Sequence, residues 1–251
     1  MGILRKLGTY VSLVDQAKIP LPDRMSDSLY GVFKAHEILV KQNSGGKLTD
    51  YELLKAQIRV IDAAVYLMDQ NRLGGEFACI FQFEPEWFAA EKQLIEEDMK
   101  QYQDDLKHGH TYQAFVNRGQ AEPVSGLWLD HPRSIFFRIW AWNDPKSPGG
   151  KGYQFLALDM SIPDKNRFVI GVDPESGTDL QGLGQEMERH ESEKRKRLGK
   201  ERPVHPVRKP ADNSDPWYFG QGHGYAVIDS PGEGTVLTAE EVEQIHRNWK
   251  P

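Results

Sequence analysis

Through residues 1–70, hydrophobic side chains recur every three or four positions, the spacing that places them on one side of an α-helix. Three such segments are separated by polar or glycine-rich stretches. The Thr-Asp-Tyr-Glu sequence at 49–52 has the form of a capping box and begins the third segment. The apolar positions of this third helix are Leu54, Ile58, Ile61, Ala64, Leu67 and Met68. The pattern predicts a helical subdomain over residues 1–75.

At residue 76 the pattern changes to alternation. Residues 76–83 alternate Phe and Cys with other side chains, which predicts a strand, and Pro85 then begins a helix to residue 107 with an acidic outer face. Further strands are expected, in chain order, at 110–117, 126–131, 134–142, 153–160 and 167–173. Their short, turn-rich connections favour antiparallel pairing. Helices followed by strands indicate an α+β fold, with N-terminal helices packed on a mainly antiparallel sheet.

After residue 175 the chain becomes strongly charged. A helix is expected to begin near 178, and a basic arm follows over 194–209, where Lys194, Arg195, Lys196 and Arg197 stand in succession. Prolines then predict an extended linker. The predicted organisation is a helical subdomain over 1–75, a sheet region with one inserted helix over 76–175, a charged helix and basic linker over 176–216, and C-terminal strands with a helix that join the sheet over 217–251. A second capping box at 238–241 begins the last helix.

Composition narrows the class of protein. A net charge of −6 argues against a general nucleic-acid coat and leaves the basic arm as the only route to nucleic acid. One cysteine excludes an internal disulfide framework and fits a reducing compartment, so we expect a cytoplasmic protein. The chain shows neither a signal peptide nor a run of membrane-spanning length. No membrane contact is therefore expected. No metal or cofactor is expected either, because the sequence has no Walker loop, no His-Glu-x-x-His motif and no series of cysteines.

The glycine-rich stretch at 220–224 raises the question of a phosphate site. A phosphate loop needs a helix directly after the glycines, whereas here Tyr225 begins a β-type sequence, so a bent strand is the better interpretation. His108 and His110 have zinc-ligand spacing, but the first is expected to close a helix and the second to open a strand. Histidines from several strands, His110, His131 and His223, together with Asp159, form the alternative catalytic hypothesis. Arg138 is the expected partner of Asp159, should that carboxylate be buried.

The leading hypothesis is a protein-binding protein, an adaptor or an inhibitor of the immunity-protein kind, with an acidic and aromatic surface. If residues 134–142 form a strand, Arg138, Trp140 and Trp142 share one face, and this composition is typical of interface hot spots. Trp217 and Tyr218 belong to the same predicted contact set. The alternatives are a hydrolase or metal-dependent phosphodiesterase using the histidines above, and a structural or assembly subunit that clasps a neighbour with the basic arm.

Overall fold

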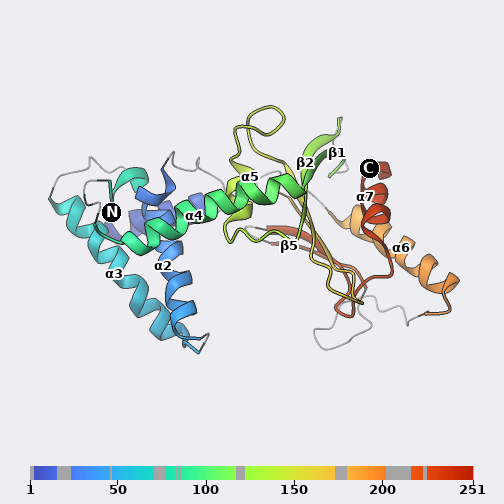
Figure 1. The fold of residues 1–251 in the computed structure, drawn as a ribbon, viewed down its shortest axis with the longest axis horizontal. Helices are drawn as coiled ribbons and strands as arrows, with labels where there is room; N and C mark the ends of the chain where they lie inside the picture. The colour runs from blue at the N-terminus through green and yellow to red at the C-terminus, as the bar shows by residue number, and fades with distance from the viewer. Residues whose placement is uncertain are drawn as a thin grey trace. The chain divides into compact units, whose positions relative to one another are not determined.

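The computed structural model describes residues 3–15, 24–45, 47–70, 77–82, 84, 86–116, 122–172, 180–201, 216–222 and 225–250. The chain divides into two compact units, Met1–Gln101 and Tyr102–Pro251 (Figure 1). The first unit is helical, and the second holds one mixed, mostly antiparallel sheet with helices. The α+β class predicted from the sequence is confirmed. None of the described helices is long and apolar enough to cross a membrane.

The described part of the first unit consists of α-helices and two short 3-10 turns. Its elements are α1 (Ile3–Asp15), η1 (Met25–Asp27), α2 (Leu29–Asn43), α3 (Asp50–Asp69), η2 (Phe77–Cys79) and most of α4 (Ala89–Asp105). Ser28 caps α2 by accepting a 2.9 Å hydrogen bond from the Gly31 amide. Thr49 and Glu52 form the predicted capping box at the start of α3. These local bonds supply partners for the amides that the first helical turn leaves unpaired.

The strand predicted at 76–83 is wrong for the residues that the structure describes there. Phe77–Cys79 is a 3-10 turn, and Ile80 and Phe81 are buried in the helical core. The Phe81 amide donates to the Asp27 carbonyl at 2.9 Å, and its ring packs edge-on against Phe88. The alternating side chains therefore belong to a compact turn that packs among helices rather than to a strand.

Helix α4 is less acidic on its surface than its sequence suggests, because Glu91, Asp98 and Asp105 are buried. Glu91 accepts a 2.7 Å hydrogen bond from Nδ1 of His36. Hydrogen bonding to His36 and the charge of that ring keep the pKa of Glu91 below its ordinary value, although burial alone would raise it. Because these three acids are buried, the exposed surface of α4 carries fewer negative charges than the sequence predicted.

The second unit contains a six-stranded sheet with strand order β1-β2-β3-β4-β6-β5. Its strands are β1 (His110–Ala114), β2 (Val124–Asp130), β3 (Phe155–Asp159), β4 (Phe168–Val172), β5 (Tyr218–Gly222) and β6 (Tyr225–Asp229). A short 3-10 turn, η3 (Leu106–His108), precedes β1, so His108 and His110 lie in different elements as predicted. Neighbouring strands pair antiparallel except β2 and β3, which run parallel.

The parallel pair exists because the strand predicted at 134–142 is instead a helix, α5 (Phe137–Trp142). Two parallel neighbours need a crossover connection, usually helical, and residues 131–154 supply it. Gly126 allows the two strands to pair closely, since a Cβ there would lie 2.1 Å from the Phe155 ring. The connection turns at Gly152, whose φ of +86° brings it against the Trp142 carbonyl, where a side chain would clash.

One face of the sheet carries the main core. Helices α6 (Gln181–Arg197) and α7 (Ala239–Asn248) lie on this face (Figure 1). A second capping box, Thr238 with Glu241, begins α7 as predicted. The buried side chains include Trp128, Phe155, Phe168, Ile170, Ile228, Leu183, Met187, Val242 and Ile245.

The basic run at 194–197 is not an extended arm, because it forms the last turn of α6. Arg195 is buried and donates from Nε to Glu191 at 2.6 Å, and its Nη2 lies 2.9 Å from a Glu233 oxygen. Lys194 pairs with Glu241 of α7 at 2.5 Å. Cations at the C-terminal end of a helix also interact favourably with its dipole. Residues 202–215 of the predicted arm and linker lie outside the described residues.

Candidate functional site

The residues predicted from the sequence to form one aromatic contact surface differ in their exposure. Trp140 is 4% exposed and Trp217 is 1% exposed, so neither indole is available to a partner. Trp142 and Tyr218 are half-buried, and Arg138 is exposed with its guanidinium 5.9 Å from the centroid of the Trp142 ring. Because α5 is a helix, these side chains do not share the flat strand face on which the prediction depended. The expected pairing of Arg138 with Asp159 is also replaced by this stacking contact.

Beside α5, the sheet face opposite the main core has a small apolar hollow of about 70 Å³. Phe137, Arg138 and Trp142 line it from the helix, and Leu158, Val169 and Val227 are among the strand residues that line it. A volume of this size is well below the several hundred Å³ of ordinary ligand sites. The hollow therefore accommodates at most one side chain.

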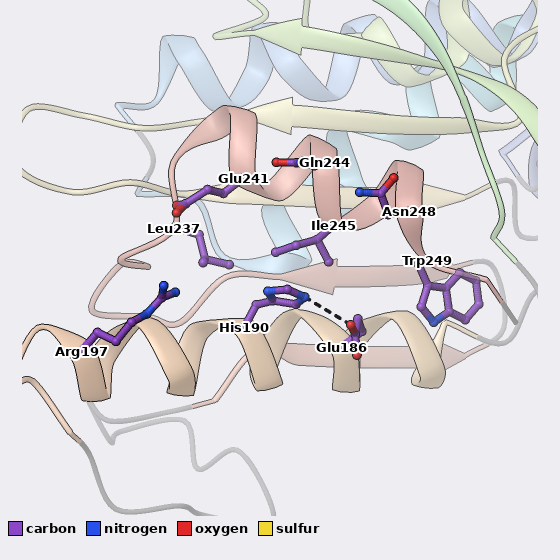
Figure 2. A pocket seen from close by; sticks show the side chains of 9 residues that line it. All are labelled: Glu186, His190, Arg197, Leu237, Glu241, Gln244, Ile245, Asn248 and Trp249. Atoms are coloured by element: carbon purple, nitrogen blue, oxygen red, sulfur yellow. Dashed lines mark ion pairs between the residues drawn. The ribbon is translucent and has the colours of Figure 1, made fainter.

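A larger polar pocket of about 330 Å³ lies between α6 and α7. Figure 2 shows Glu186, His190 and Arg197 on α6 facing Gln244 and other side chains on α7. The remaining lining residues are Leu237, Glu241, Ile245, Asn248 and Trp249.

Charges in this pocket are largely matched to one another. His190 Nε2 lies 3.2 Å from a Glu186 oxygen, and Glu241 pairs with Lys194 at 2.5 Å. Hydrogen bonds from Arg189 are the main cause that lowers the pKa of Glu186. The pocket has room for a small polar molecule, but its lining includes no nucleophilic side chain held by a base.

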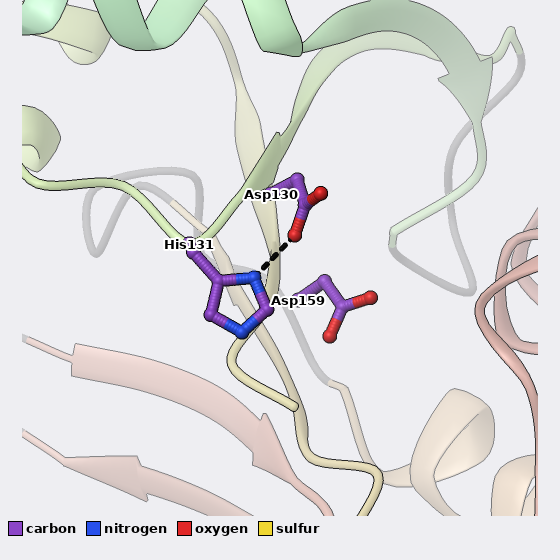
Figure 3. Close-up of side chains that lie close together, drawn as sticks. All are labelled: Asp130, His131 and Asp159. Atoms are coloured by element: carbon purple, nitrogen blue, oxygen red, sulfur yellow. Dashed lines mark hydrogen bonds and ion pairs between the residues drawn. The ribbon is translucent and has the colours of Figure 1, made fainter. Parts of the chain in front are cut away.

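The structure brings together two residues of the predicted catalytic set, His131 and Asp159, and adds Asp130 (Figure 3). Asp130 and Asp159 are direct neighbours in the parallel register, and each is the last residue of its strand. The His131 amide donates to the Asp159 carbonyl at 2.8 Å, and the Ser161 amide donates to Asp159 Oδ1 at 2.9 Å. The sequence did not identify Asp130 as part of the site, since its alignment with Asp159 depends on strand pairing.

His131 is held at both ring nitrogens. Nδ1 contacts Asp130 Oδ1 and Nε2 contacts the Ser161 carbonyl. Its backbone φ of +44° lies in the left-handed region, which costs a residue with a Cβ about 1–2 kcal/mol. The hydrogen bond to Ser161, followed by that to Asp130, raises the pKa of His131, because both acceptors favour the doubly protonated ring. The three side chains are partly or well exposed, so this charge is screened by water.

The other predicted histidines lie elsewhere. His110 Nε2 is 3.0 Å from Glu243 Oε2 of α7, and its ring stacks on Trp128 at 6.1 Å between centroids. His223 lies outside the described residues. Cys79 is half-buried in a 3-10 turn rather than mid-strand.

A buried polar pair that the sequence did not predict joins β1 to α7. The Tyr112 hydroxyl and Nδ1 of His246 share a 2.8 Å hydrogen bond, and both side chains are buried. Burial lowers the pKa of His246 to about 3 and raises that of Tyr112 well above its ordinary value. Both groups are therefore neutral near pH 7. The pair lies in the closed core, where it connects two elements.

Among the described residues of the first unit, the large apolar side chains that are well exposed lie on α3. Tyr51 is 74% exposed, Leu54 55%, Ile58 43% and Tyr66 53%. We call these four residues the α3 outer face. At 100° per residue they lie on the side of the helix opposite the fully buried Val60, Ala64 and Leu67. The prediction that Leu54 and Ile58 belong to the buried stripe is therefore wrong.

No known protein family matches this sequence, and a comparison with curated proteins also finds no match.

Proposed function

We propose that this chain is a protein-binding protein that assembles with a second copy of itself through the α3 outer face. The proposal keeps the protein-binding hypothesis and moves its contact surface from the Trp140 and Trp142 region to α3. One observation supports it: α3 buries one apolar side, with Val60, Ala64 and Leu67, in the core and exposes the α3 outer face to water. Exposed apolar patches on soluble proteins are typical of interaction sites.

The spacing of the outer face supports a helix as the partner element. Tyr51, Leu54 and Ile58 follow the three-then-four spacing of a coiled-coil seam. α3 has 20 residues and so extends for about 30 Å, enough to pack along another helix of similar length.

The distribution of charge supports a second copy in antiparallel orientation. With a two-fold axis between positions 58 and 59, Ile58 lies beside the axis, and Tyr51 lies opposite Tyr66 of the second copy. Lys55 and Asp62, both exposed, are equally far from that axis on its two sides and would pair with each other across it. A two-fold contact requires a surface that is complementary to itself, and the pairing of Lys55 with Asp62 meets this requirement for charge.

Sedimentation velocity of the full chain over a range of concentrations tests the proposal. We expect a reversible dimer, and we expect Ile58→Glu to raise its dissociation constant at least about tenfold, because two carboxylates replace two apolar contacts at the axis. Ile162→Glu, at another well-exposed apolar residue, is the matched control and should leave the dimer unchanged. A protein that stays monomeric, or a dimer that Ile58→Glu does not weaken, overturns the proposal.

Charge reversal tests the orientation. Lys55→Asp and Asp62→Lys should each weaken the dimer, because each places like charges opposite one another. The double variant should restore it. Failure of the double variant to recover would exclude the antiparallel register while leaving the α3 contact intact.

A metal-dependent hydrolase is the second candidate function, and the convergence of His131, Asp159 and Asp130 is the observation that favours it. Turnover of a chromogenic phosphodiester with added Zn²⁺ or Mn²⁺ tests it. Loss of that turnover in Asp159→Asn supports hydrolysis, and the absence of turnover in the unaltered protein excludes this substrate class.

A further inference from the structure

We infer that Asp130, His131 and Asp159 form a binding site for a divalent cation of the zinc class at the carboxyl ends of β2 and β3. The inference is independent of the α3 proposal and concerns the other unit. It starts from geometry: one ligand atom from each of the three side chains lies within 4.8 Å of those of the other two (Figure 3). An ion with four ligands at about 2.0–2.2 Å holds them roughly 3.4 Å from one another, so small side-chain movements close the set.

The fold produces this convergence through its one parallel strand pair. Because β2 and β3 run in the same direction and Asp130 is in register with Asp159, both carboxylates reach the same edge of the sheet. His131 follows directly, and its left-handed backbone turns the chain so that its ring lies beside both carboxylates. Crevices at the carboxyl ends of parallel strands are common binding positions in α/β proteins, and this edge has the same local geometry.

The Ser161 carbonyl contacts Nε2 of His131 and so orients the imidazole with Nδ1 toward Asp130. An ion bound at Nδ1 takes its three protein ligands from the three side chains and leaves its fourth position to water, as zinc sites with three protein ligands do. The Ser161 amide meanwhile binds Asp159 Oδ1 at 2.9 Å and fixes the orientation of that carboxylate. A hydrogen-bonded support of this kind positions metal-ligating carboxylates in known sites.

Charge and ligand chemistry indicate the class of ion. Two adjacent carboxylates repel each other, and a divalent cation between them neutralises both, whereas a single proton on His131 neutralises one. The imidazole nitrogen suits Zn²⁺ and other late transition ions, while Mg²⁺ and Ca²⁺ prefer sites made of oxygen alone. Because metal binding requires the imidazole to release a proton, the ion and the proton compete for this site.

Isothermal titration calorimetry of the full chain with Zn²⁺ tests the inference at about pH 8, where a proton competes least for the imidazole. We expect binding by the unaltered protein, and a loss of at least about tenfold in affinity for Asp130→Asn and for Asp159→Asn. The second variant retains an oxygen that can accept from the Ser161 amide, so the turn is preserved. Far-ultraviolet circular dichroism of each variant verifies that it is folded.

Matched controls separate this site from other histidine–carboxylate pairs. Glu186 and His190 stand four residues apart on α6 and offer a competing surface site, and His110 with Glu243 offers another. Glu186→Gln and Glu243→Gln should leave the tight binding event unchanged. Binding that either control removes, or binding that survives both aspartate variants, overturns the inference. Equal affinity for Zn²⁺ and Mg²⁺ would also contradict it, because a site with an imidazole ligand discriminates between them.

Discussion

Acidification from about pH 8 to pH 5 should destabilise the sheet unit through one side chain, His246 of α7. The imidazole is fully buried between β1 and α7, with Nδ1 bound to the Tyr112 hydroxyl at 2.8 Å and the ring 4.7 Å from Phe155 between centroids. Burial is the main cause that lowers the pKa of His246 from 6.5 to about 3, and the charge of Arg247 acts in the same direction. A hydrogen bond to the backbone of Phe115 opposes them.

The sign and size of the effect follow from proton linkage. Below pH 6.5 the unfolded chain takes up a proton at this histidine, while the folded chain stays neutral until the pH approaches about 3. The free energy of unfolding is therefore unaffected by this group above pH 6.5 and falls steadily below it. At about 1.36 kcal/mol per pH unit, the loss is roughly 2 kcal/mol at pH 5.

Urea unfolding of the unaltered protein and of His246→Gln, each at about pH 8 and pH 5, measures this loss. Glutamine stays neutral at both values, so the variant should lose roughly 2 kcal/mol less than the unaltered protein between them. Its lower overall stability does not matter, because only the difference between the two pH values is compared. All other histidines and acids titrate in both proteins and cancel in this comparison.

Two results would refute the reasoning. One is an equal pH dependence in the two proteins, which would mean that His246 contributes nothing to the loss. The other is an NMR titration of the folded protein in which the His246 ring changes protonation near pH 6.5 rather than below pH 4. Either result would place the ring in contact with water.

Two further predictions concern packing and a buried ion pair. Gly126→Ala should lower the free energy of unfolding by about 1–3 kcal/mol, because the new Cβ would lie 2.1 Å from the Phe155 ring. Gly171→Ala on β4 is the control, since its Cβ would meet nothing within 4 Å. Urea unfolding of both variants measures the two losses, and equal losses would contradict the close packing of β2 on β3. Glu191→Leu should cost about 1–3 kcal/mol, because the buried Arg195 loses its 2.6 Å partner on α6 and keeps Glu233 and the Gly234 carbonyl. A thermal unfolding midpoint that does not move would show that the Glu191–Arg195 pair is dispensable.

Signals that act over a few residues were enough to predict much of this fold. The capping boxes at Thr49 and Thr238 identify the starts of α3 and α7, because each depends on bonds within a single helical turn. Runs of aromatic and β-branched residues bounded by turn formers predicted β1, β2, β3 and β4. Burial alternates along β1 and β4, whereas β2 and β3 are buried over consecutive residues.

The prediction for α3 shows why a clear helical pattern does not reveal which side of the helix is buried. Its sequence carries two apolar rows, one through Leu54 and Ile58 and another through Val60, Ala64 and Leu67. Which row faces the core depends on where α2 and the residues before it pack, and that is a tertiary property. The prediction from residue spacing therefore assigned residues of both rows to a single buried side of the helix.

Residues 134–142 show how the misassignment of one element conceals a site. Aromatic and β-branched side chains fill both sides of this segment, so its periodicity distinguishes poorly between a strand and a two-turn helix. As a strand it would stand between β2 and β3, and Asp130 and Asp159 would be separated by two strand spacings, about 10 Å. As the helix α5 it leaves the sheet, and the two aspartates become neighbours in register. The Asp130, His131 and Asp159 cluster is therefore a consequence of the crossover. The sequence could place Asp130 and His131 at one strand end and Asp159 near another, without showing that those ends meet.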